Sequence, residues 1–294
     1  MNPLRTTAVI GGGTMGADVA HTLVHAGCET HVVEPVAALR DAIAKRLPAA
    51  KLHASLETVP WPRIGAVIEA IPERLEPKRA LFTDLVRLAP ADALLTSNSS
   101  AIPIGKIGEG LATRERMFGL HYFMPAHQVP LVEVIYSEAS DAALGDALCD
   151  FMRATGKVPV KVRKDVPGFL ANRLKHALCR EAFALIDAGV ATAEDVDLAV
   201  RFGFGFRFIA AGPVLQRDLA GLDVHCAAAA TIYPDLAAGT KPAKVLADHV
   251  AAGHHGMKSG RGFFEWTPER AQRERERYAR RLEAALALVA DDLQ

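Results

Sequence analysis

The sequence predicts an α/β protein in which a doubly wound, mostly parallel sheet is followed by an all-α C-terminal domain. The first short apolar run passes directly into a glycine-rich turn and then into a helical pattern. Strand patterns alternate with helical patterns as far as Val162, as in a parallel sheet with crossover helices. After Lys164–Gly168 no strand pattern follows and the chain becomes helical, so we expect domains at 1–165 and 166–294.

The individual elements follow from apolar runs bounded by polar or glycine-rich turns. Such runs predict strands at Thr7–Ile10, Thr30–Val33, Ala66–Ala70, Ala93–Thr96, Met117–His121, Leu131–Ile135 and Val158–Val162. Helical spacing predicts helices between several of these strands, such as Pro77–Leu88. The helices expected in the C-terminal domain are Phe169–Asp187, Glu194–Val200, Val214–Thr231, Ala243–Ala252 and Pro268–Leu293.

The composition is typical of a soluble globular protein, because half of the 294 residues are apolar and 34 basic side chains balance 34 acidic ones. Without a basic excess, we expect neither a nucleic acid nor a membrane surface as the main partner. The four cysteines have no metal-ligand spacing, so we expect reduced thiols and no metal site. The N-terminus lacks the pattern of a signal peptide and no apolar run reaches the length of a membrane span, which predicts a cytoplasmic protein.

The glycine-rich turn Gly11–Gly16, GGGTMG, has the form G-x-G-x-x-G between a strand and a helix. Such glycines let the backbone approach a pyrophosphate, and the helix N-terminus stabilises its charge. The next strand ends in Glu34, whose carboxylate can accept hydrogen bonds from a ribose hydroxyl but would repel a 2′-phosphate. The sequence therefore predicts a Rossmann domain that prefers NAD to NADP, with a purely structural glycine turn as the alternative.

The stretch Gly119–Val134, GLHYFMPAHQVPLVEV, carries a histidine and a carboxylate on two neighbouring predicted strands. His121 ends the first of these strands, and Glu133 lies within the second. A carboxylate bonded to one ring nitrogen raises the basicity of the other, as a general base for an alcohol proton requires. The alternative is a core histidine bonded to a backbone carbonyl, with a strand-edge glutamate in solvent.

Polar residues also follow the ends of the predicted strands, where ligands bind in doubly wound sheets. These residues are Glu73, Asn98, Ser99, Ser100 and His121. We expect them to converge on one edge of the sheet. The alternative for any one of them is a helix cap, since Ser99 and Ser100 precede a turn.

Together these features resemble the L-3-hydroxyacyl-CoA dehydrogenase family from Ala8 to about Trp266. The resemblance rests on six motifs in the same order, which are GGGTMG, EAIPERLEPK (Glu69–Lys78), SNSSAI (Ser97–Ile102), GLHYFMP with PLVEV, KDVPGFLANR (Lys164–Arg173) and MKSGRGFFEW (Met257–Trp266). It implies that His121 is the general base for the substrate hydroxyl and that Glu133 orients it. It also implies that Ser100 and Asn172 donate hydrogen bonds near the substrate oxygen.

The resemblance implies a set of cofactor contacts as well. They are Gly11, Gly13, Gly16, Glu34, Glu73, Lys78, Ser100 and Lys258. To these we add Thr14 and Met15 of the glycine turn and Asn98 at the sheet edge as expected contacts of NAD.

The chain departs from the family pattern in two places. Met124 stands before Pro125, where the family usually has an asparagine that touches the cofactor, so this contact is missing. Family members that bind CoA insert a helical arm after the second strand. The distance in sequence from Glu34 to Val67 leaves room for a crossover helix and a short strand and little more.

One further turn differs from the fatty-acid enzymes of the family. Phe202–Pro213 is longer than their equivalent turn and closer to the branch that contains gulonate dehydrogenase, carnitine dehydrogenase and a pyridine-ring catabolic dehydrogenase. Arg207 in this turn is a candidate partner for a substrate carboxylate, and a surface or capping arginine is the alternative.

The sequence thus predicts an NAD-dependent oxidoreductase that reversibly oxidises the 3-hydroxy group of a short 3-hydroxyacyl-CoA, or of a related 3-hydroxy acid. As hydride leaves C3, the hydroxyl proton becomes acidic and a neutral imidazole takes it. The alternatives are a dehydrogenase of a hydroxy acid without CoA and a non-catalytic NAD-binding protein. The apolar excess of Phe169–Ile186 and Val214–Ile232 predicts a homodimer.

Overall fold

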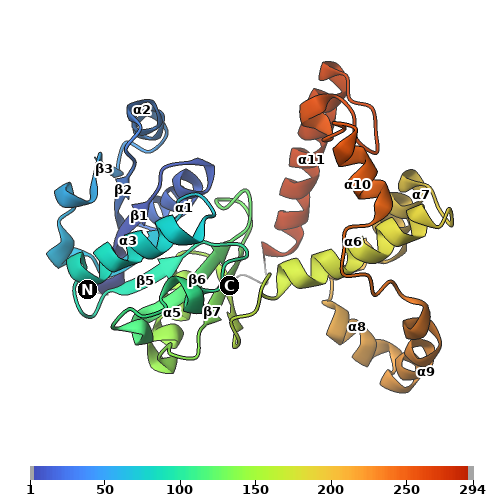
Figure 1. Cartoon of the computed structure of the whole chain (residues 1–294), viewed down its shortest axis with the longest axis horizontal. Helices are drawn as coiled ribbons and strands as arrows, with labels where there is room; N and C mark the ends of the chain where they lie inside the picture. Colours follow the sequence, from blue (N-terminus) through green and yellow to red (C-terminus); the bar gives the residue numbers. More distant parts are fainter. Residues whose placement is uncertain (1–2, 291–294) are drawn as a thin grey trace. The chain divides into compact units, whose positions relative to one another are not determined.

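The computed structural model describes residues 3–290, in two compact units (Figure 1). The first unit extends to Arg173 and the second begins at Leu174, later than the boundary expected after residue 165. The difference arises because the residues just before Arg173 pack on the first unit. The ring of Phe169 is buried there in a cluster with Ile135 and Val162.

The first unit is built around one eight-stranded sheet with the order β3-β2-β1-β4-β5-β6-β7-β8. The strands are β1 (Thr6–Ile10), β2 (Glu29–Val33), β3 (Lys51–His53), β4 (Ala66–Glu69), β5 (Leu94–Ser97), β6 (Met117–Tyr122), β7 (Leu131–Tyr136) and β8 (Val158–Val162). Neighbouring strands are parallel except β6 and β7, which run antiparallel. The predicted doubly wound, mostly parallel sheet is confirmed.

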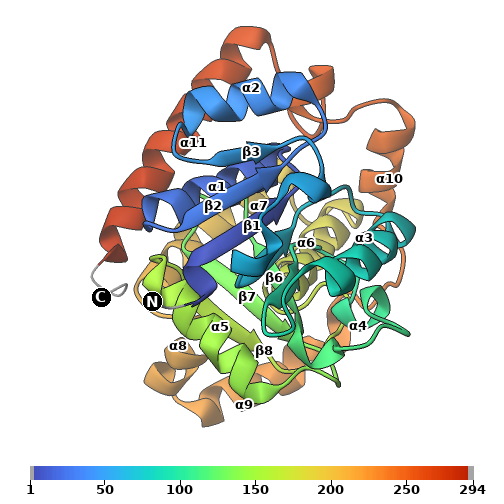
Figure 2. The same cartoon turned by 90° about the vertical axis from the view of Figure 1, so that its left-hand side faces the viewer.

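Helices cover both faces of this sheet, with α1 and α5 on one face and α3 and α4 on the other (Figure 2). The helices of this unit are α1 (Thr14–His25), α2 (Ala37–Arg46), α3 (Leu75–Leu88), α4 (Ile104–Ile107) and α5 (Ala142–Ala154), with short 3-10 helices at Pro3–Arg5, Leu56–Thr58, Trp61–Arg63 and Arg114–Arg116. Val19 and Leu23 lie one helical turn apart on α1, so both reach the same core. Leu81 and Leu85 do the same for α3 on the opposite face.

The direction of the strands decides where polar residues meet. The carboxyl ends of β1, β2, β4, β5 and β6 share one edge of the sheet because these strands are parallel. Because β7 runs the other way, the first half of β7 lies beside the last half of β6, and Glu133 is paired directly with His121. The predicted histidine and carboxylate therefore lie at the same edge as the glycine turn.

The named elements of the second unit's described part are all helices, with two isolated β-bridges at Gly256–Arg261 and Arg261–Glu265, and the predicted all-α domain is confirmed. Its elements are α6 (Ala171–Asp187, which begins before the unit boundary), α7 (Ala193–Leu198), a π-helix (Ala199–Phe204), a 3-10 helix (Gly205–Ile209), α8 (Pro213–Ala220), α9 (Leu222–Ile232), a 3-10 helix (Tyr233–Asp235), α10 (Lys244–Ala251), a 3-10 helix (Met257–Ser259) and α11 (Pro268–Leu288). Within residues 3–290, no single helix is long and apolar enough to cross a membrane. The bent pair Ala193–Ile209 and Pro213–Ala220, at 91°, passes that test by length and composition.

Three predicted helix boundaries are wrong. The single helix expected at Val214–Thr231 is divided at Gly221, whose φ of 98° is not helical. The helix expected from Phe169 begins at Ala171, because Gly168 and Phe169 have φ values of 76° and 50°. The last helix ends at Leu288, and residues 291–293 of the predicted range lie outside the described residues.

Candidate active site

The glycine-rich turn joins β1 to α1, and its backbone packs closely against neighbouring backbone atoms. Gly11 has a φ of 102°, and a Cβ there would lie 2.7 Å from the carbonyl oxygen of Ala70. A Cβ on Gly16 would lie 1.8 Å from the carbonyl oxygen of Gly11. The backbone itself therefore requires both glycines. A Cβ on Gly13 would meet nothing within 4 Å, so this position leaves open space beside the helix.

Glu34 follows β2 and turns its carboxylate back toward the glycine turn. One carboxylate oxygen accepts a hydrogen bond from the amide of Gly12 at 2.8 Å, and the other accepts one from the amide of Val36 at 2.8 Å. A Cβ on Gly12 would lie 2.8 Å from Cβ of Glu34 and 2.7 Å from Cδ1 of Ile43. Gly12 is thus a residue of the site that the sequence prediction missed, and the unbroken run of three glycines is its signal.

The geometry at this end of the sheet fits a dinucleotide. Among the described residues, no side-chain hydrogen bond caps α1 at Gly13, and a Cβ on Gly13 would meet nothing within 4 Å, so there is open space where the helix begins, beside Thr14 and Met15. The first amides of a helix and the helix dipole stabilise a phosphate. Glu34 stands at the end of the second strand, the position from which an acidic side chain binds a ribose hydroxyl.

A buried ion pair closes the end of β4. Nζ of Lys78 lies 2.6 Å from Oε1 of Glu69, and the two side chains are 1% and 0% exposed. The same ammonium donates to the carbonyl oxygen of Ile71 at 3.2 Å and lies 3.3 Å from Glu73. The other oxygen of Glu69 accepts a hydrogen bond from Oγ of Ser97 at 2.5 Å. Lys78 is therefore enclosed and holds Glu73, and its contact with NAD stays a prediction.

Glu73 fixes the loop that follows β5. Its Oε1 accepts hydrogen bonds from Oγ of Ser99 at 2.6 Å and from the amides of Ser100 and Ala101 at 3.0 Å each. Burial acts to raise the pKa of Glu73, but the hydrogen bonds from Ser99 and Ala101 and the charge of Lys78 outweigh it and hold the pKa below the ordinary value. The hydroxyl of Ser100 is exposed and bonds to no other described residue, which leaves it available to a ligand.

Asn98 connects this loop to the strand that carries the histidine. Its side-chain oxygen accepts a hydrogen bond from the amide of Tyr122 at 2.9 Å, and the residue is 9% exposed. This oxygen is used within the protein, so the predicted contact of Asn98 with NAD stays a prediction.

Met124 lies two residues after Tyr122 and is 68% exposed. Its thioether cannot donate a hydrogen bond as an asparagine would.

His121 and Glu133 form the predicted pair. Nδ1 of His121 lies 2.7 Å from Oε2 of Glu133, and the two side chains are 4% and 1% exposed. With Nδ1 donating to the carboxylate, Nε2 is left as the basic nitrogen of the ring. The arrangement can take a proton at Nε2 and stabilise the resulting imidazolium through Nδ1.

Two aromatic rings that the sequence prediction missed lie beside His121. The ring centroid of Phe123 lies 4.5 Å from that of His121, and the centroid of Phe169 lies 5.6 Å away. Phe123 could have been found, because it follows His121 by only two residues, just beyond the end of β6. Phe169 could not, because a long-range contact brings it there. Its φ of 50° costs a non-glycine residue about 1–2 kcal/mol.

The second oxygen of Glu133 is bound by the start of α6. Oε1 accepts hydrogen bonds from the amide of Leu170 at 3.0 Å and from the amide of Ala171 at 2.7 Å. Burial acts to raise the pKa of Glu133, but the hydrogen bonds from His121, Ala171 and Leu170 outweigh it and hold the pKa below the ordinary value. The carboxylate therefore stays ionised beside the ring.

Of the remaining predicted residues, Asn172 directly follows Ala171, whereas Arg207 and Lys258 lie further along the chain. Asn172 is the second residue of α6, is half-buried, and makes no side-chain hydrogen bond to another described residue. Arg207 and Lys258 belong to the second unit and are exposed. The guanidinium of Arg207 lies 5.8 Å from the ring centroid of Phe206. Their roles toward substrate or cofactor stay predictions.

Comparison with known families decides the assignment. The NAD binding domain of 3-hydroxyacyl-CoA dehydrogenase matches residues 40–166, and the C-terminal domain of the same family matches residues 168–266. A pyridine nucleotide-disulphide oxidoreductase family matches residues 6–53, the segment with the glycine turn and Glu34. The chain belongs to the 3-hydroxyacyl-CoA dehydrogenase family. It is an NAD-dependent oxidoreductase that acts on a CH–OH group.

Several relatives in this family resemble the chain closely. The 5-formyl-3-hydroxy-2-methylpyridine 4-carboxylate 5-dehydrogenase of Mesorhizobium japonicum is 34% identical over 97% of this chain and 98% of its own. The crystal structure of a dehydrogenase of that name, described as an NAD⁺-dependent dismutase, superposes with a TM-score of 0.90, at 30% identity, over 99% of this chain and 98% of the other. The 3-hydroxybutyryl-CoA dehydrogenase structure from Escherichia coli gives 0.75 at 31% identity, over 90% and 60%.

We predict that His121→Gln lowers kcat by at least about a hundredfold while NADH binding changes by less than about twofold, because the variant loses a proton acceptor and no cofactor contact. Absorbance of NADH measures turnover, and NADH fluorescence measures binding. His127→Gln is the matched control, since His127 lies in the next loop and its Nδ1 faces Asp18 at 3.0 Å. A residual rate of His121→Gln within about tenfold of wild type would contradict the assignment.

We predict a pH-dependent loss of stability for Glu133→Gln. Because folding lowers the pKa of Glu133 below 4.5, its stabilising contribution is present above that pH and is lost as the pH falls through the folded pKa. The variant should be less stable than wild type by about 1–3 kcal/mol at pH 7, and the difference should shrink as the pH falls below about 4.5. Urea unfolding measures it, with the exposed Glu138→Gln as control. A deficit that does not change with pH would rule out this interpretation.

Proposed function

We propose that this protein is an NAD-dependent dehydrogenase of a small hydroxy acid, or of its carbonyl counterpart, that is not carried on coenzyme A. The short connection between β2 and β4 carries this proposal. Its described residues form α2, β3 and two 3-10 helices, and no helical arm stands where CoA-binding members of the family insert one. The adenine end of CoA would lack the surface against which it lies in those members.

The connection is held in the first unit by its own contacts. Strand β3 pairs in parallel with β2, from His31 beside Lys51 to Val33 beside His53. Further along the connection, Trp61 is buried in the same core cluster as Val33. A segment committed to the sheet and its core cannot also extend as an arm.

The comparisons support the same substrate class. A relative that matches 97% of this chain, and a crystal structure of the same name that superposes with a TM-score of 0.90, are named for a pyridine that bears a carboxylate, a hydroxyl and a formyl group. The 3-hydroxybutyryl-CoA dehydrogenase structure gives a TM-score of 0.75. A small substrate that carries its own carboxylate is therefore the better candidate.

The chain's own residues supply proton transfer and positioning. NAD supplies the hydride acceptor when it is bound. We infer that His121 takes the hydroxyl proton at Nε2 while Glu133 stabilises the imidazolium. Ser100 and Asn172 are the proposed hydrogen-bond donors to the reacting oxygen, and Arg207 remains the candidate partner for a substrate carboxylate.

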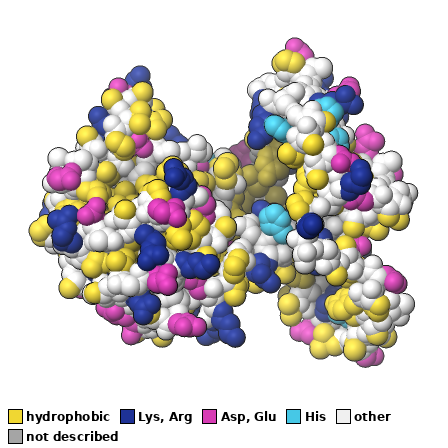
Figure 3. Space-filling view, in the orientation of Figure 1, with side chains coloured by type: hydrophobic (Ala, Val, Ile, Leu, Met, Phe, Trp, Pro, Cys, Tyr) yellow, Lys and Arg dark blue, Asp and Glu magenta, His cyan; other side chains and the backbone are white. Residues whose placement is uncertain are grey.

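We also propose that the protein is a homodimer formed through helices of the second unit. Among the described residues from Leu174 onward, Ala271 alone is buried. Large apolar side chains of this unit are exposed instead, including Val214 at 77%, Leu219 at 76% and Val224 at 64%. Figure 3 shows apolar side chains at the surface over α8 and α9. Apolar surface of this extent marks an interface between proteins.

We predict that 3-hydroxybutyryl-CoA and its N-acetylcysteamine thioester give kcat/KM values within about tenfold of each other, equivalent to about 1.4 kcal/mol. Without an arm, the remote part of CoA cannot contribute binding energy at the reacting carbon. A free hydroxy or formyl carboxylate should exceed both in a panel that is followed by NADH absorbance. An advantage of about a thousandfold for the CoA ester would refute the proposal.

Arg207→Ala should reduce kcat/KM for free acids by at least about tenfold and leave the thioesters unchanged, because only the acids offer a carboxylate for the guanidinium. Arg201→Ala is the matched control, since Arg201 lies over the ring of Phe202 at 5.0 Å, much as Arg207 lies over Phe206. Equal losses for acids and thioesters would remove Arg207 from the proposed substrate contacts.

We predict that light scattering at micromolar concentration gives twice the chain's mass of 31.5 kDa. Leu219→Asp should shift the protein toward the monomer, because a charge would have to be buried in an apolar interface. Leu39→Asp is the control, since Leu39 is 40% exposed on α2 of the first unit. A monomeric mass for the wild-type protein would contradict the proposed dimer.

A further inference from the structure

We propose that Phe169 is a positioning residue for the dyad, because its turn presents two amides of α6 to Glu133 and so fixes the carboxylate on which His121 depends. The inference rests on the proposed role of His121 and Glu133 in proton transfer. Phe169 itself acts through Glu133 and is not assigned a contact with the reacting atoms.

The turn before α6 has a defined geometry. Phe169 donates its backbone amide to the carbonyl oxygen of Val166 at 3.0 Å, with Pro167 and Gly168 between them. Gly168 has a φ of 76°, and proline followed by such a glycine is the arrangement of a type II turn. Phe169 then adopts a φ of 50°, so two successive residues are left-handed. The amides of the next two residues thereby point to Glu133.

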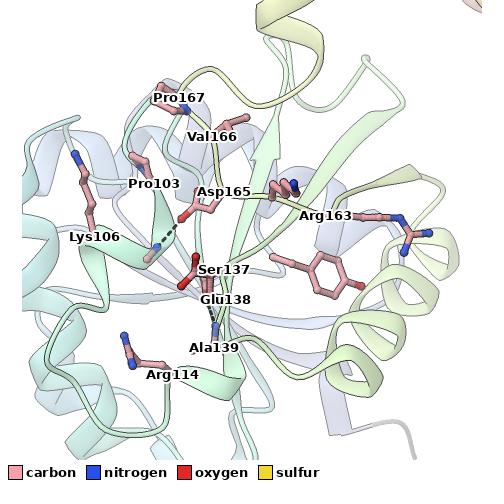
Figure 4. Close-up of a pocket in the computed structure, with 13 residues that line it drawn as sticks. Pro103, Lys106, Arg114, Ser137, Glu138, Ala139, Arg163, Asp165, Val166 and Pro167 are labelled. Carbon is pink, nitrogen blue, oxygen red and sulfur yellow. Dashed lines mark hydrogen bonds between the residues drawn. The ribbon is translucent and has the colours of Figure 1, made fainter.

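Packing holds both ends of this turn. Upstream, Oδ2 of Asp165 accepts a hydrogen bond from the amide of Gly105 at 2.7 Å, at the wall of a groove of about 1070 Å³ (Figure 4). Downstream, the ring of Phe169 is 2% exposed and packs with Ile135 and Val162. Burial of a large aromatic ring offsets the unfavourable backbone conformation of a non-glycine residue. The ring is therefore the anchor that keeps the amides in place.

The carboxylate of Glu133 divides its two oxygens between two elements. Oε1 accepts from the amides of Leu170 and Ala171, at 3.0 Å and 2.7 Å. Oε2 is joined to Nδ1 of His121 at 2.7 Å. Strand β8 places Val160 opposite Glu133, so His121 is the titratable group that faces the carboxylate. With both oxygens bound, the carboxylate cannot rotate, and the direction of Nε2 is set.

The amides also limit the charge that Glu133 directs at His121. A hydrogen bond to a carboxylate disperses its negative charge, so a carboxylate that loses two donors stabilises a neighbouring imidazolium more strongly. Oxidation requires the neutral imidazole, because this form accepts the proton. Loosening the turn should therefore move the pH midpoint for oxidation upward as well as reduce the rate.

If the ring of Phe169 only fills the core, a different result is expected. A comparison with Phe123 distinguishes this role from the proposed positioning role. Phe123 also places a ring beside His121, at 4.5 Å between centroids, but the backbone amides that bind Glu133 belong to Leu170 and Ala171 and not to the residues around Phe123. If solvent exclusion by the ring is the whole effect, removal of either ring should have the same result. If the turn matters, only the change at Phe169 should alter Glu133.

The test compares Phe169→Ala, Phe169→Leu and Phe123→Ala in steady-state oxidation over a range of pH. We expect Phe169→Ala to lower kcat by about tenfold or more, to leave KM for NAD within about twofold, and to raise the pH midpoint by about one unit. Phe169→Leu keeps an apolar side chain of similar size, so its kcat and its pH midpoint should both be close to those of wild type. Phe123→Ala should not move the midpoint. The same midpoint shift in Phe123→Ala, or none in Phe169→Ala, would overturn the proposal.

A second readout needs no substrate and so separates this inference from the proposed function. Amide hydrogen exchange of Leu170 and Ala171, measured by NMR on the full chain, should be at least about tenfold faster in Phe169→Ala and unchanged in Phe123→Ala. Unchanged exchange in Phe169→Ala would show that its ring does not hold the turn. If exchange is faster in Phe169→Ala but the wild-type protein oxidises none of the tested substrates, the proposed role of the turn is supported and the proposed function is refuted.

Discussion

The carboxylate of Glu133 is the constraint on which the rest of the site depends. It lies in the antiparallel strand β7, opposite His121 on β6, and receives two amides from the start of α6. A buried carboxylate without such donors would be strongly destabilising, so the strand pair and the helix start must form together. The one antiparallel pair of the sheet is what places this carboxylate at the edge where the parallel strands end.

Carboxylates organise the rest of that edge by the same principle. Glu34 is held by the amides of Gly12 and Val36, and Glu73 is held by the loop after β5. Glu69 is paired with Lys78 inside the protein. A buried ion pair of this kind contributes little net stability relative to apolar packing. It does fix the positions of the two side chains, because separating them would leave an unpaired charge buried in the protein. The carboxylates at this edge are therefore held by contacts within the protein.

The proposed substrate class depends on one connection of the first unit. The connection between β2 and β4 consists largely of α2, β3 and short 3-10 helices. Buried residues such as Trp61 hold this connection against the core of the first unit. Under the proposed function, binding energy for the reacting group would come from contacts near it, because the described residues of this connection form no helical arm for a long carrier. A substrate with its own charged group close to the reacting carbon suits such a site.

Whereas the pairing of His121 with Glu133 was implied by the resemblance to the family, the sequence by itself determined the strand, glycine turn and helix at Gly11–Gly16 and the domain order. These features follow from local periodicity and from backbone conformations that few residue types adopt. Only the tertiary structure decided that Lys78 is enclosed, that Gly221 divides a helix, and that Phe169 turns two amides toward Glu133. The physical reason is that a hydrogen-bond partner far away in sequence depends on how strands and helices pack, and local patterns contain no information about that packing.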